Sequence, residues 1–307
     1  MKVAILCYHR VGGSGIVAYE VGRAMAEERG HEVHFIGLQP PYRLKEASSE
    51  ALHFHRVWVK EYPVFDYQPY DLALASQLSE IIIRYGIDVI HSHYVLPHAI
   101  SAILARNIVG RPLRLVTTLH GTDITVVGQH PSMMNITRYG IEESDRVTAV
   151  SMNLKAETEM VFRPRKQIEC IYNFVNTAVF HPISEKNEGK PRTDEPVFLH
   201  VSNLREVKGP LDVIRIFAKA RDLLGGHGLL KVIGEGPLES VMIGEAEKLG
   251  IEKYVAFLGV RNDLVWLFNC GDICIMPSRK EAFGLAGLEA MACGTPVLAS
   301  AVGGLPE

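Results

Sequence analysis

The chain has 307 residues, which is long for a single hydrophobic core and suits two domains. It has a globular composition, with 47% hydrophobic and 22% charged residues, and its formal charge of −3 gives no reason to expect a nucleic-acid partner. Five scattered cysteines without paired spacing indicate reduced thiols, and the lack of a signal sequence or of 18 consecutive apolar residues predicts a cytoplasmic protein without stable membrane insertion.

In the first half of the chain, short apolar runs alternate with longer segments of helical period. We expect strands at 3–8, 32–38, 88–94 and 113–121, and helices around 15–29, 70–85 and 97–109. Strands that are buried on both faces and separated by helices are typical of a parallel, doubly wound α/β sheet.

A polar, proline-bearing stretch at 181–196 interrupts this alternation and is predicted to be an exposed connection. Strands are then expected at 197–202, 229–234, 255–260, 272–278 and 295–300, with helices around 209–224, 237–249, 262–269 and 284–293. The simplest interpretation is two Rossmann-like lobes, at 1–172 and 197–307, joined by a hinge at 173–196. The chain stops directly after a strand and a glycine-rich turn, so we expect its natural C-terminal part to be missing.

The first loop suited to an anion contains Gly12, Gly13 and Gly15, between the first strand and the first helix. Free backbone N–H groups at a helix start favour an anion, although such turns also occur for purely structural reasons. The turn lacks the GxGxxG pattern, and the second strand ends in Gly37 rather than in an acidic residue. A nicotinamide dehydrogenase is therefore disfavoured.

The second lobe has two more loops of this kind. "SNLREVKG" (202–209) places Arg205 and Lys208 directly after a strand, where cations can face a ligand, and a solvated pair is the alternative. In "IGEGP" (233–237), two glycines permit close approach of a ligand. We expect these loops to meet at the carboxyl edge of the sheet.

Histidines mark the corresponding edge of the first lobe. His91 and His93 share one strand face, a spacing compatible with a metal, but no third ligand with suitable spacing is evident. A structural or polar lining role is favoured, and no metal is expected. His120 in "TTLHGTD" ends a predicted strand, which places its imidazole at the edge, with a core histidine as the alternative.

Two glutamates, Glu281 and Glu289, flank the start of a predicted helix in "EAFGLAGLE". A regular helical rise separates such positions by about 12 Å. Paired glycosidase carboxylates lie roughly 5–9.5 Å apart, so the spacing disfavours a hydrolytic acid/base pair. It favours two anchors along one extended ligand.

These motifs resemble those of the retaining, two-lobed GT-B glycosyltransferases of family 4, whose Glu-x7-Glu signature matches Glu281 and Glu289. "SNLREVKG", "GEGP" and "GGLPE" support the likeness, which covers essentially the whole chain. "CYHRVGGSGIVAYEVG", "TTLHGTDITVVG" and "LEAMACGTPV" are most similar to the branch that joins GlcNAc to L-malate in bacillithiol biosynthesis.

The resemblance implies two lobes facing across a cleft and transfer of GlcNAc from UDP-GlcNAc to the hydroxyl of L-malate, without a metal. Front-face attack is favoured over a covalent intermediate, since no carboxylate in an acceptor-side motif is placed as a nucleophile. Three alternatives stay open: a lipid or polysaccharide acceptor, another hydroxy acid, and a nucleotide-binding protein without turnover. A homo-oligomer is also left open.

The resemblance also assigns roles to individual positions. Glu289 is expected at the uridine ribose, Glu281 and His120 at the transferred sugar, and Arg205 and Lys208 at the diphosphate. Backbone groups complete the donor site, at Gly13, Gly15, Val260, Arg261, Phe283, Gly284 and Leu285. For malate, Arg138 is the first choice, with Ser14, Tyr94, Thr118 and Asn153 as neighbours.

Overall fold

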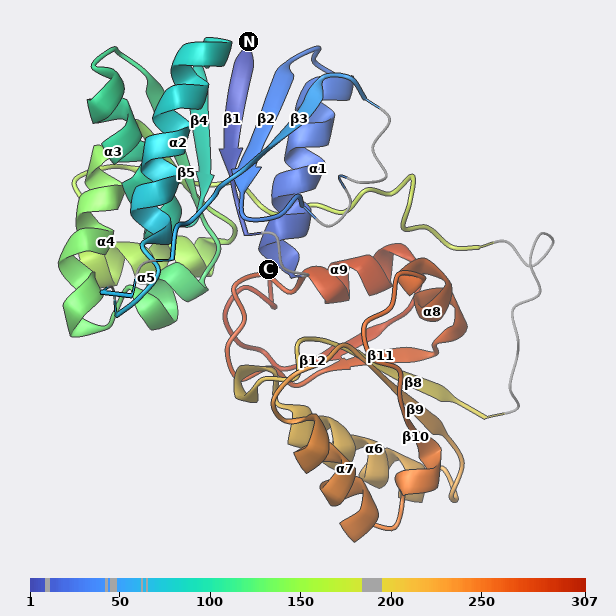
Figure 1. Cartoon of the computed structure of the whole chain (residues 1–307). Coiled ribbons are helices and arrows are strands. Elements are labelled where there is room, and N and C mark those ends of the chain that lie inside the picture. Colours follow the sequence, from blue (N-terminus) through green and yellow to red (C-terminus); the bar gives the residue numbers. More distant parts are fainter. Residues whose placement is uncertain (9–11, 42–43, 45–48, 62, 65, 184–194) are drawn as a thin grey trace. The chain divides into compact units, whose positions relative to one another are not determined.

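The computed structural model describes residues 1–8, 12–41, 44, 49–61, 63–64, 66–183 and 195–307. The chain divides into two compact units, Met1–Asn173 and Phe174–Glu307, and each is described by itself. Figure 1 shows that each unit is a sheet covered by helices. Within the described part of the chain, no helix is long and apolar enough to cross a membrane.

The N-terminal unit is built on seven parallel strands in the order β3-β2-β1-β4-β5-β6-β7. The strands are β1 (Lys2–Leu6), β2 (Glu32–Gly37), β3 (Leu52–Arg56), β4 (Val89–His93), β5 (Arg114–Leu119), β6 (Arg146–Ala149) and β7 (Ile168–Cys170). The helices are α1 (Gly13–Glu27), α2 (Tyr70–Tyr85), α3 (Ile100–Val109), α4 (Pro131–Glu143) and α5 (Met152–Phe162). Two short turns complete the unit, η2 (Val95–Ala99), which is interrupted by an extended residue at Leu96, and η3 (Asp123–Val127).

Alternate residues of β1 serve two hydrophobic cores. Ala4 and Leu6 pack into a cluster on the face covered by α2 and α3, whereas Val3 and Ile5 belong to the cluster of α1 on the other face. On α1, a Cβ at Gly22 would lie 2.5 Å from the ring of Phe35, so only glycine allows this approach of helix to sheet. The predicted doubly wound sheet is confirmed, with helices on both faces.

The C-terminal unit has five parallel strands in the order β10-β9-β8-β11-β12. They are β8 (Val197–Val201), β9 (Leu229–Ile233), β10 (Val255–Phe257), β11 (Ile273–Met276) and β12 (Val297–Ala299). The helices are α6 (Pro210–Leu223), α7 (Glu239–Lys248), α8 (Leu264–Cys270) and α9 (Leu285–Ala292), with 3-10 turns η4 (Glu206–Lys208) and η5 (Glu252–Tyr254). Every strand and helix predicted in this half is present, with shorter bounds.

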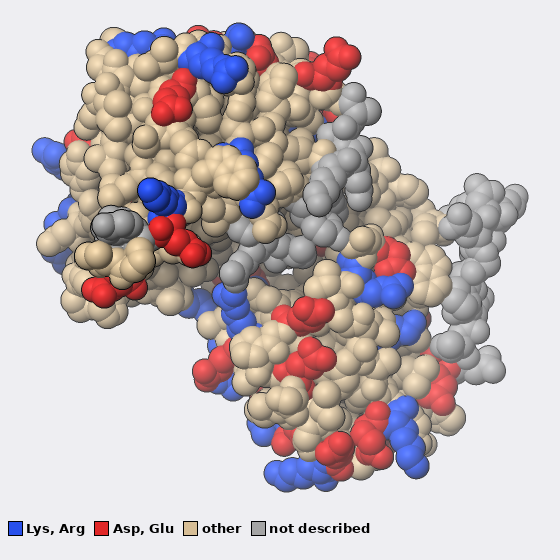
Figure 2. Space-filling view, in the orientation of Figure 1, with Lys and Arg blue, Asp and Glu red and all other residues tan. Residues whose placement is uncertain are grey.

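Surface charge is mixed over the face shown in Figure 2, where Lys and Arg side chains are interspersed with Asp and Glu. This agrees with the formal charge of −3. A mixed surface of this kind favours solubility and gives little attraction for a polyanion.

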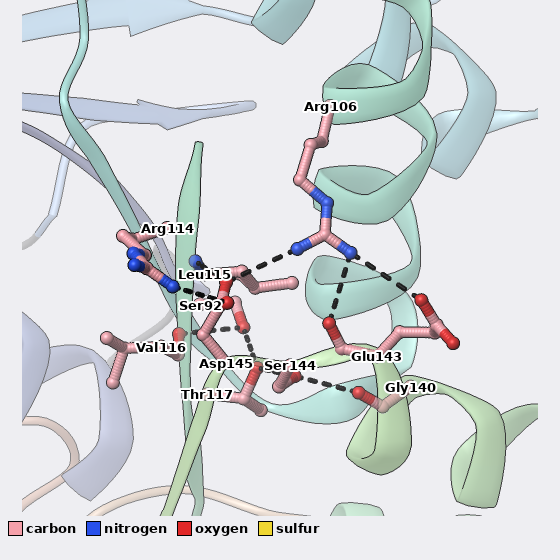
Figure 3. A network of polar contacts seen from close by, with 10 residues as sticks. All are labelled: Ser92, Arg106, Arg114, Leu115, Val116, Thr117, Gly140, Glu143, Ser144 and Asp145. Atoms are coloured by element: carbon pink, nitrogen blue, oxygen red, sulfur yellow. Dashed lines mark hydrogen bonds and ion pairs between the residues drawn. The ribbon is translucent and has the colours of Figure 1, made fainter. Parts of the chain in front are cut away.

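A polar network joins β4, β5, α3 and α4 to the start of β6 (Figure 3). Asp145, just before β6, accepts the backbone N–H of Leu115 at 2.8 Å and pairs with Arg106 at 3.3 Å and Arg114 at 3.2 Å. Beside it, a hydroxyl chain runs from Ser92 through Thr117 and Ser144 to the carbonyl oxygen of Gly140, with its three links at 2.7–2.8 Å. The network fixes the end of α4 against the sheet.

We expect Asp145→Ala to destabilise the N-terminal unit by about 1–3 kcal/mol, because it leaves the Leu115 N–H without its acceptor. Arg114→Ala removes an ion pair whose arginine is 77% exposed, so it should cost less than about 1 kcal/mol. Urea unfolding of both variants measures the difference. Equal losses in the two variants would contradict the dominant role given to the backbone acceptor.

Candidate functional site

In the N-terminal unit, the first group able to bind a ligand is the start of α1, the element that follows β1 in the chain. No side chain caps this helix and no acidic residue lies in its first turn, so its leading N–H groups have no side-chain acceptor within the helix. Gly15 is buried, and Gly13 and Ser14 are more accessible. The arrangement suits an anion, as the sequence predicted for this turn.

Tyr94 lies where β4 ends and connects this helix start to the neighbouring strands. Its N–H donates to the carbonyl oxygen of Thr118, and its hydroxyl donates to Ser14 Oγ at 3.0 Å. The backbone of Tyr94 has φ of 84°, a left-handed conformation that non-glycine residues seldom adopt. Its ring lies 5.1 Å from that of His120. Three predicted site residues, Ser14, Tyr94 and His120, are thus brought together.

His120 belongs to a group of histidine rings beneath this edge. Its Nε2 lies 2.8 Å from Nδ1 of His93, and the two rings are stacked at 5.1 Å. Burial, followed by the proximity of His91 and His98, lowers the pKa of His120 to about 3. The imidazole is therefore neutral at pH 7, so it can exchange hydrogen bonds with a sugar hydroxyl but adds no positive charge.

Asp123 joins the loop after β4 to the loop after β5. It was not singled out from the sequence. Oδ2 accepts the N–H of Val95 at 3.1 Å, and Oδ1 accepts the N–H groups of His120 at 3.3 Å and Gly121 at 3.0 Å. Burial raises the pKa of this carboxyl to about 6, against the opposing effect of those hydrogen bonds. Its position in "HGTD", three residues after the histidine, was the available signal.

The remaining acceptor-side residues are placed differently. Thr118 is buried, and its hydroxyl bonds His91 Nε2 and Thr148 Oγ1, both at 2.8 Å, so it serves the interior of the sheet. Arg138 is exposed on α4 and makes no ion pair with any described residue. Asn153 is exposed in the first turn of α5. Of these three, Thr118 is joined to Tyr94 through its backbone carbonyl oxygen. The proposed contacts of Thr118, Arg138 and Asn153 with malate stay predictions.

In the C-terminal unit, Lys208 and Glu281 meet although 73 positions separate them in the chain. Lys208 ends the turn after β8, Glu281 follows β11, and Nζ lies 2.5 Å from Glu281 Oε2. Ser278 Oγ is 3.5 Å from the same oxygen. The lysine side chain is 23% exposed and the glutamate 11%, so the pair is shielded from solvent without being closed off.

Glycines allow the loops around this pair to pack closely. Gly209, with φ of 63°, has no room for a Cβ because the carbonyl oxygen of Pro277 is in contact. Gly303 is likewise pressed against the carbonyl oxygen of Glu281, whose oxygen also accepts the N–H of Gly304 at 3.0 Å. Gly284 adopts φ of 93° and begins α9 without a side-chain cap, so the amides that follow it face outward from the helix start.

The other donor-side residues follow the same edge. Glu289 is buried in α9 and 5% exposed, whereas Arg205 is exposed and makes no ion pair with a described residue. Val260 is 46% exposed after β10. Arg261 forms a double contact with Asp263, at 2.9 and 2.6 Å, so its side chain is occupied while its backbone is left to contact a ligand.

Comparison with known proteins identifies the family to which these two edges belong. Residues 11–179 match the model of Glycosyltransferase Family 4, and residues 183–307 match that of Glycosyl transferases group 1. The chain belongs to glycosyltransferase family 4. This glycosyltransferase is 44% identical to N-acetyl-alpha-D-glucosaminyl L-malate synthase of Bacillus anthracis, over all of the chain and 80% of the relative. It is 30% identical to an uncharacterised glycosyltransferase of Methanocaldococcus jannaschii, over 100% and 82% of the two chains.

Solved structures support the predicted GT-B fold of the glycosyltransferase. Sucrose-phosphate synthase from Thermosynechococcus elongatus matches 99% of the chain with a TM-score of 0.80 and 22% identity, over 82% of that structure. Anabaena HepE in complex with UDP and glucose matches 99% of the chain, over 82% of its own length, with a TM-score of 0.76 and 20% identity. The expectation of two parallel α/β lobes of the GT-B type is confirmed.

We expect Asp123→Ala to lower the free energy of unfolding by about 1–3 kcal/mol at pH 5, because buried N–H groups lose their acceptor. Turnover should fall more than stability alone explains, since the Tyr94 and His120 loops lose their shared anchor. Urea unfolding and steady-state kinetics measure the two effects, with exposed Asp66→Ala as the control. Unchanged kinetics in a destabilised Asp123→Ala protein would limit this carboxyl to a structural role.

The wild-type and Asp123→Ala proteins also test how the stability contributed by Asp123 changes with pH. The pKa of Asp123 is raised from 3.8 to about 6, so the folded state holds this proton more tightly than the unfolded state. Its contribution to stability is full below about pH 4 and declines as the pH rises through 6. The stability difference between wild type and Asp123→Ala should therefore fall over this window.

Proposed function

We propose that this family 4 glycosyltransferase moves GlcNAc from UDP-GlcNAc to the hydroxyl of L-malate, with retention of configuration. The observation that carries the proposal is the 44% identity to the GlcNAc-malate synthase over the whole chain. The structure of HepE with UDP and glucose supports a UDP-sugar as the class of donor. Both edges described above contain groups suited to these substrates.

The donor is proposed to bind the C-terminal unit. Arg205 and Lys208 neutralise the diphosphate, and the amides at Phe283, Gly284 and Leu285 add hydrogen bonds at the start of α9. Glu281 holds the Lys208 ammonium at 2.5 Å, which fixes the cation before the donor arrives. Because negative charge grows on the diphosphate as it leaves, a preorganised cation stabilises the transition state more than the ground state.

Glu281 and Glu289 then have separate tasks along the same ligand. Glu281 contacts the hexose while it orients Lys208, and buried Glu289 accepts hydrogen bonds from the ribose hydroxyls. The exposed backbone at Val260 and Arg261 receives the uracil. A carboxylate that is largely desolvated makes stronger hydrogen bonds to hydroxyl groups than one in water.

Malate is proposed to bind the N-terminal unit. Its two carboxylates need donors, and the first choice is the guanidinium of Arg138, while the Gly13 and Gly15 amides at the start of α1 keep the donor role that the resemblance assigns to them. Ser14 and Tyr94 supply hydroxyl groups beside that helix start. The neutral imidazole of His120 is suited to a sugar hydroxyl, because it adds no charge that would hold malate at that position.

Front-face attack is the proposed chemistry. The malate hydroxyl attacks the anomeric carbon on the side from which UDP departs, and a donor phosphate oxygen accepts the hydroxyl proton. Asp123 is a buried carboxyl beside His120, but both of its oxygens accept backbone N–H groups. It is therefore poorly suited to act as the nucleophile that a covalent glycosyl intermediate requires.

Release of UDP tests the activity directly. UDP-GlcNAc with L-malate should give malate-dependent UDP, whereas UDP-glucose and a panel of other hydroxy acids should give less. Titration of the protein with UDP separates loss of catalysis from loss of donor binding. Binding of UDP without malate-dependent release would favour a nucleotide-binding protein without turnover, and release with another acceptor would reassign the substrate.

Glu289→Gln should raise the donor KM by about 10- to 100-fold, because a charge-assisted hydrogen bond contributes about 1.5–3 kcal/mol. The substitution keeps the size of the buried side chain, which protects the fold. Initial rates at varied UDP-GlcNAc measure the effect, and exposed Glu247→Gln is the matched control. A rise in the malate KM alone would show that Glu289 serves the acceptor instead.

Arg138→Ala should raise the malate KM by about 10-fold or more, since one malate carboxylate loses its charged partner. The donor KM should change by no more than about two-fold, because Arg138 is proposed to contact malate and not the donor. Initial rates at varied malate give the result. Arg146→Ala, at an exposed arginine of the same unit, is the control. An unchanged malate KM would show that the acceptor binds elsewhere.

A further inference from the structure

A histidine-rich cluster lies away from the groups assigned to sugar transfer, near the amino-terminal ends of β2 and β3. Glu32 and His34 alternate along β2, and His53 and His55 alternate along β3. The parallel register pairs His34 with His53, so all four side chains lie on one face of the sheet. This is the face that α2 covers, because His34 and His55 both pack against Tyr85 at 4.9 Å.

Three of these side chains place potential metal ligands close together. One ligand atom each from Glu32, His34 and His53 can be chosen so that all three lie within 4.8 Å of one another. Glu32 Oε1 is 3.1 Å from His34 Nε2 and 3.5 Å from His53 Nε2. Ligands about 2.0–2.2 Å from a tetrahedral Zn²⁺ are separated from each other by about 3.3–3.6 Å. Two ligand-to-ligand spacings are therefore close to those of a formed site.

Neighbouring groups orient two of the ligands. His34 Nδ1 lies 2.8 Å from His55 Nε2, an arrangement that directs the other nitrogen of His34 towards Glu32. Lys2 Nζ contacts Glu32 Oε2 at 2.9 Å, so the two oxygens of Glu32 have different partners. Metal-bound histidines in proteins commonly bond a second group through their free ring nitrogen. The His34–His55 contact supplies that bond.

The cluster is also open on one side. The His34 side chain is fully buried, whereas His53 is 40% and Glu32 33% exposed. An ion can therefore enter from solution and keep a water molecule as its fourth ligand. A hydrogen-bonded cluster is the alternative, but the 3.5 Å contact of His53 with Glu32 is long for a hydrogen bond.

We propose that Glu32, His34 and His53 bind one divalent transition-metal ion, Zn²⁺ best fitting two imidazoles and a carboxylate. The ion links β2 to the edge strand β3 and stabilises the N-terminal unit. It takes no part in glycosyl transfer, because Ser14, Tyr94 and His120 gather at the opposite, carboxyl ends of the strands. The sequence-based expectation of no metal rested on His91 and His93, for which no third ligand was evident, and on the family resemblance, and neither concerned this cluster.

The test uses the full chain without an affinity tag, freed of metal with a chelator and titrated with zinc chloride. We expect one Zn²⁺ per chain by isothermal titration calorimetry. At a free Zn²⁺ concentration 100-fold above Kd, the melting temperature of the N-terminal unit should rise by about 5–10 °C. Co²⁺ in place of Zn²⁺ should give the visible absorption of a tetrahedral site.

Variants decide whether these residues are the ligands. His53→Ala and Glu32→Gln alter partly exposed side chains, and each should weaken Zn²⁺ binding at least 100-fold and abolish the thermal shift. His55→Ala should weaken binding about 10- to 100-fold, as loss of a group behind a ligand does. His130→Ala, at an exposed histidine on the same unit, should bind as wild type does.

Circular dichroism and UDP titration check that every variant is folded. Absence of stoichiometric Zn²⁺ binding to the wild-type chain would overturn the proposal. So would binding that survives unchanged in both His53→Ala and Glu32→Gln. Neither result bears on the transferase proposal, which the malate-dependent UDP release tests separately.

Discussion

Parallel pairing of every strand is the constraint on which the rest of this molecule depends. In each sheet all ladders are parallel, so all carboxyl ends lie at one edge. That edge brings the start of α1 together with the ends of β4 and β5, and in the other unit it brings Lys208 to Glu281. The side chains that carry chemistry come from loops, but their positions are set by the order of the strands.

Much of this order could be predicted, because buried parallel strands appear in the sequence as continuous apolar runs. The runs at 3–8, 32–38, 88–94 and 113–121 correspond to β1, β2, β4 and β5. Strand β3 escaped prediction since its residues, Leu-His-Phe-His-Arg, are half-buried and polar at alternate positions. Helix α4 was not predicted either, and only Thr137, Gly140 and Ile141 of its thirteen residues are buried. A helix with so narrow a buried stripe gives a weak periodic signal.

The candidate site, too, could be predicted only in part from the sequence. Position after a strand singled out His120 and Lys208, spacing singled out Glu281, and the family resemblance added Ser14 and Tyr94. The structure brings these residues together within their units. Sequence could not show that the Thr118 hydroxyl is used inside the sheet, nor that Asp123 joins two loops. Both facts depend on β4 lying beside β5, and the residue pattern of one strand does not show which strand is its neighbour. The histidine cluster was missed for the related reason that its partner strand, β3, was missed.

The histidines of β3 lie on the edge strand of the seven-stranded sheet and affect how that edge meets other molecules. An edge strand leaves a row of backbone N–H and C=O groups without partners, and such a row can pair with a strand of another molecule. Strand β3 places His53, His55 and the exposed Arg56 along this edge, and the guanidinium of Arg56 lies 4.3 Å from the ring of Trp58. Bulky polar groups and a tethering ion both oppose such edge-to-edge growth. A chain without bound metal should therefore aggregate more readily during refolding. The contact between molecules should form at β3, the edge strand opposite to β7.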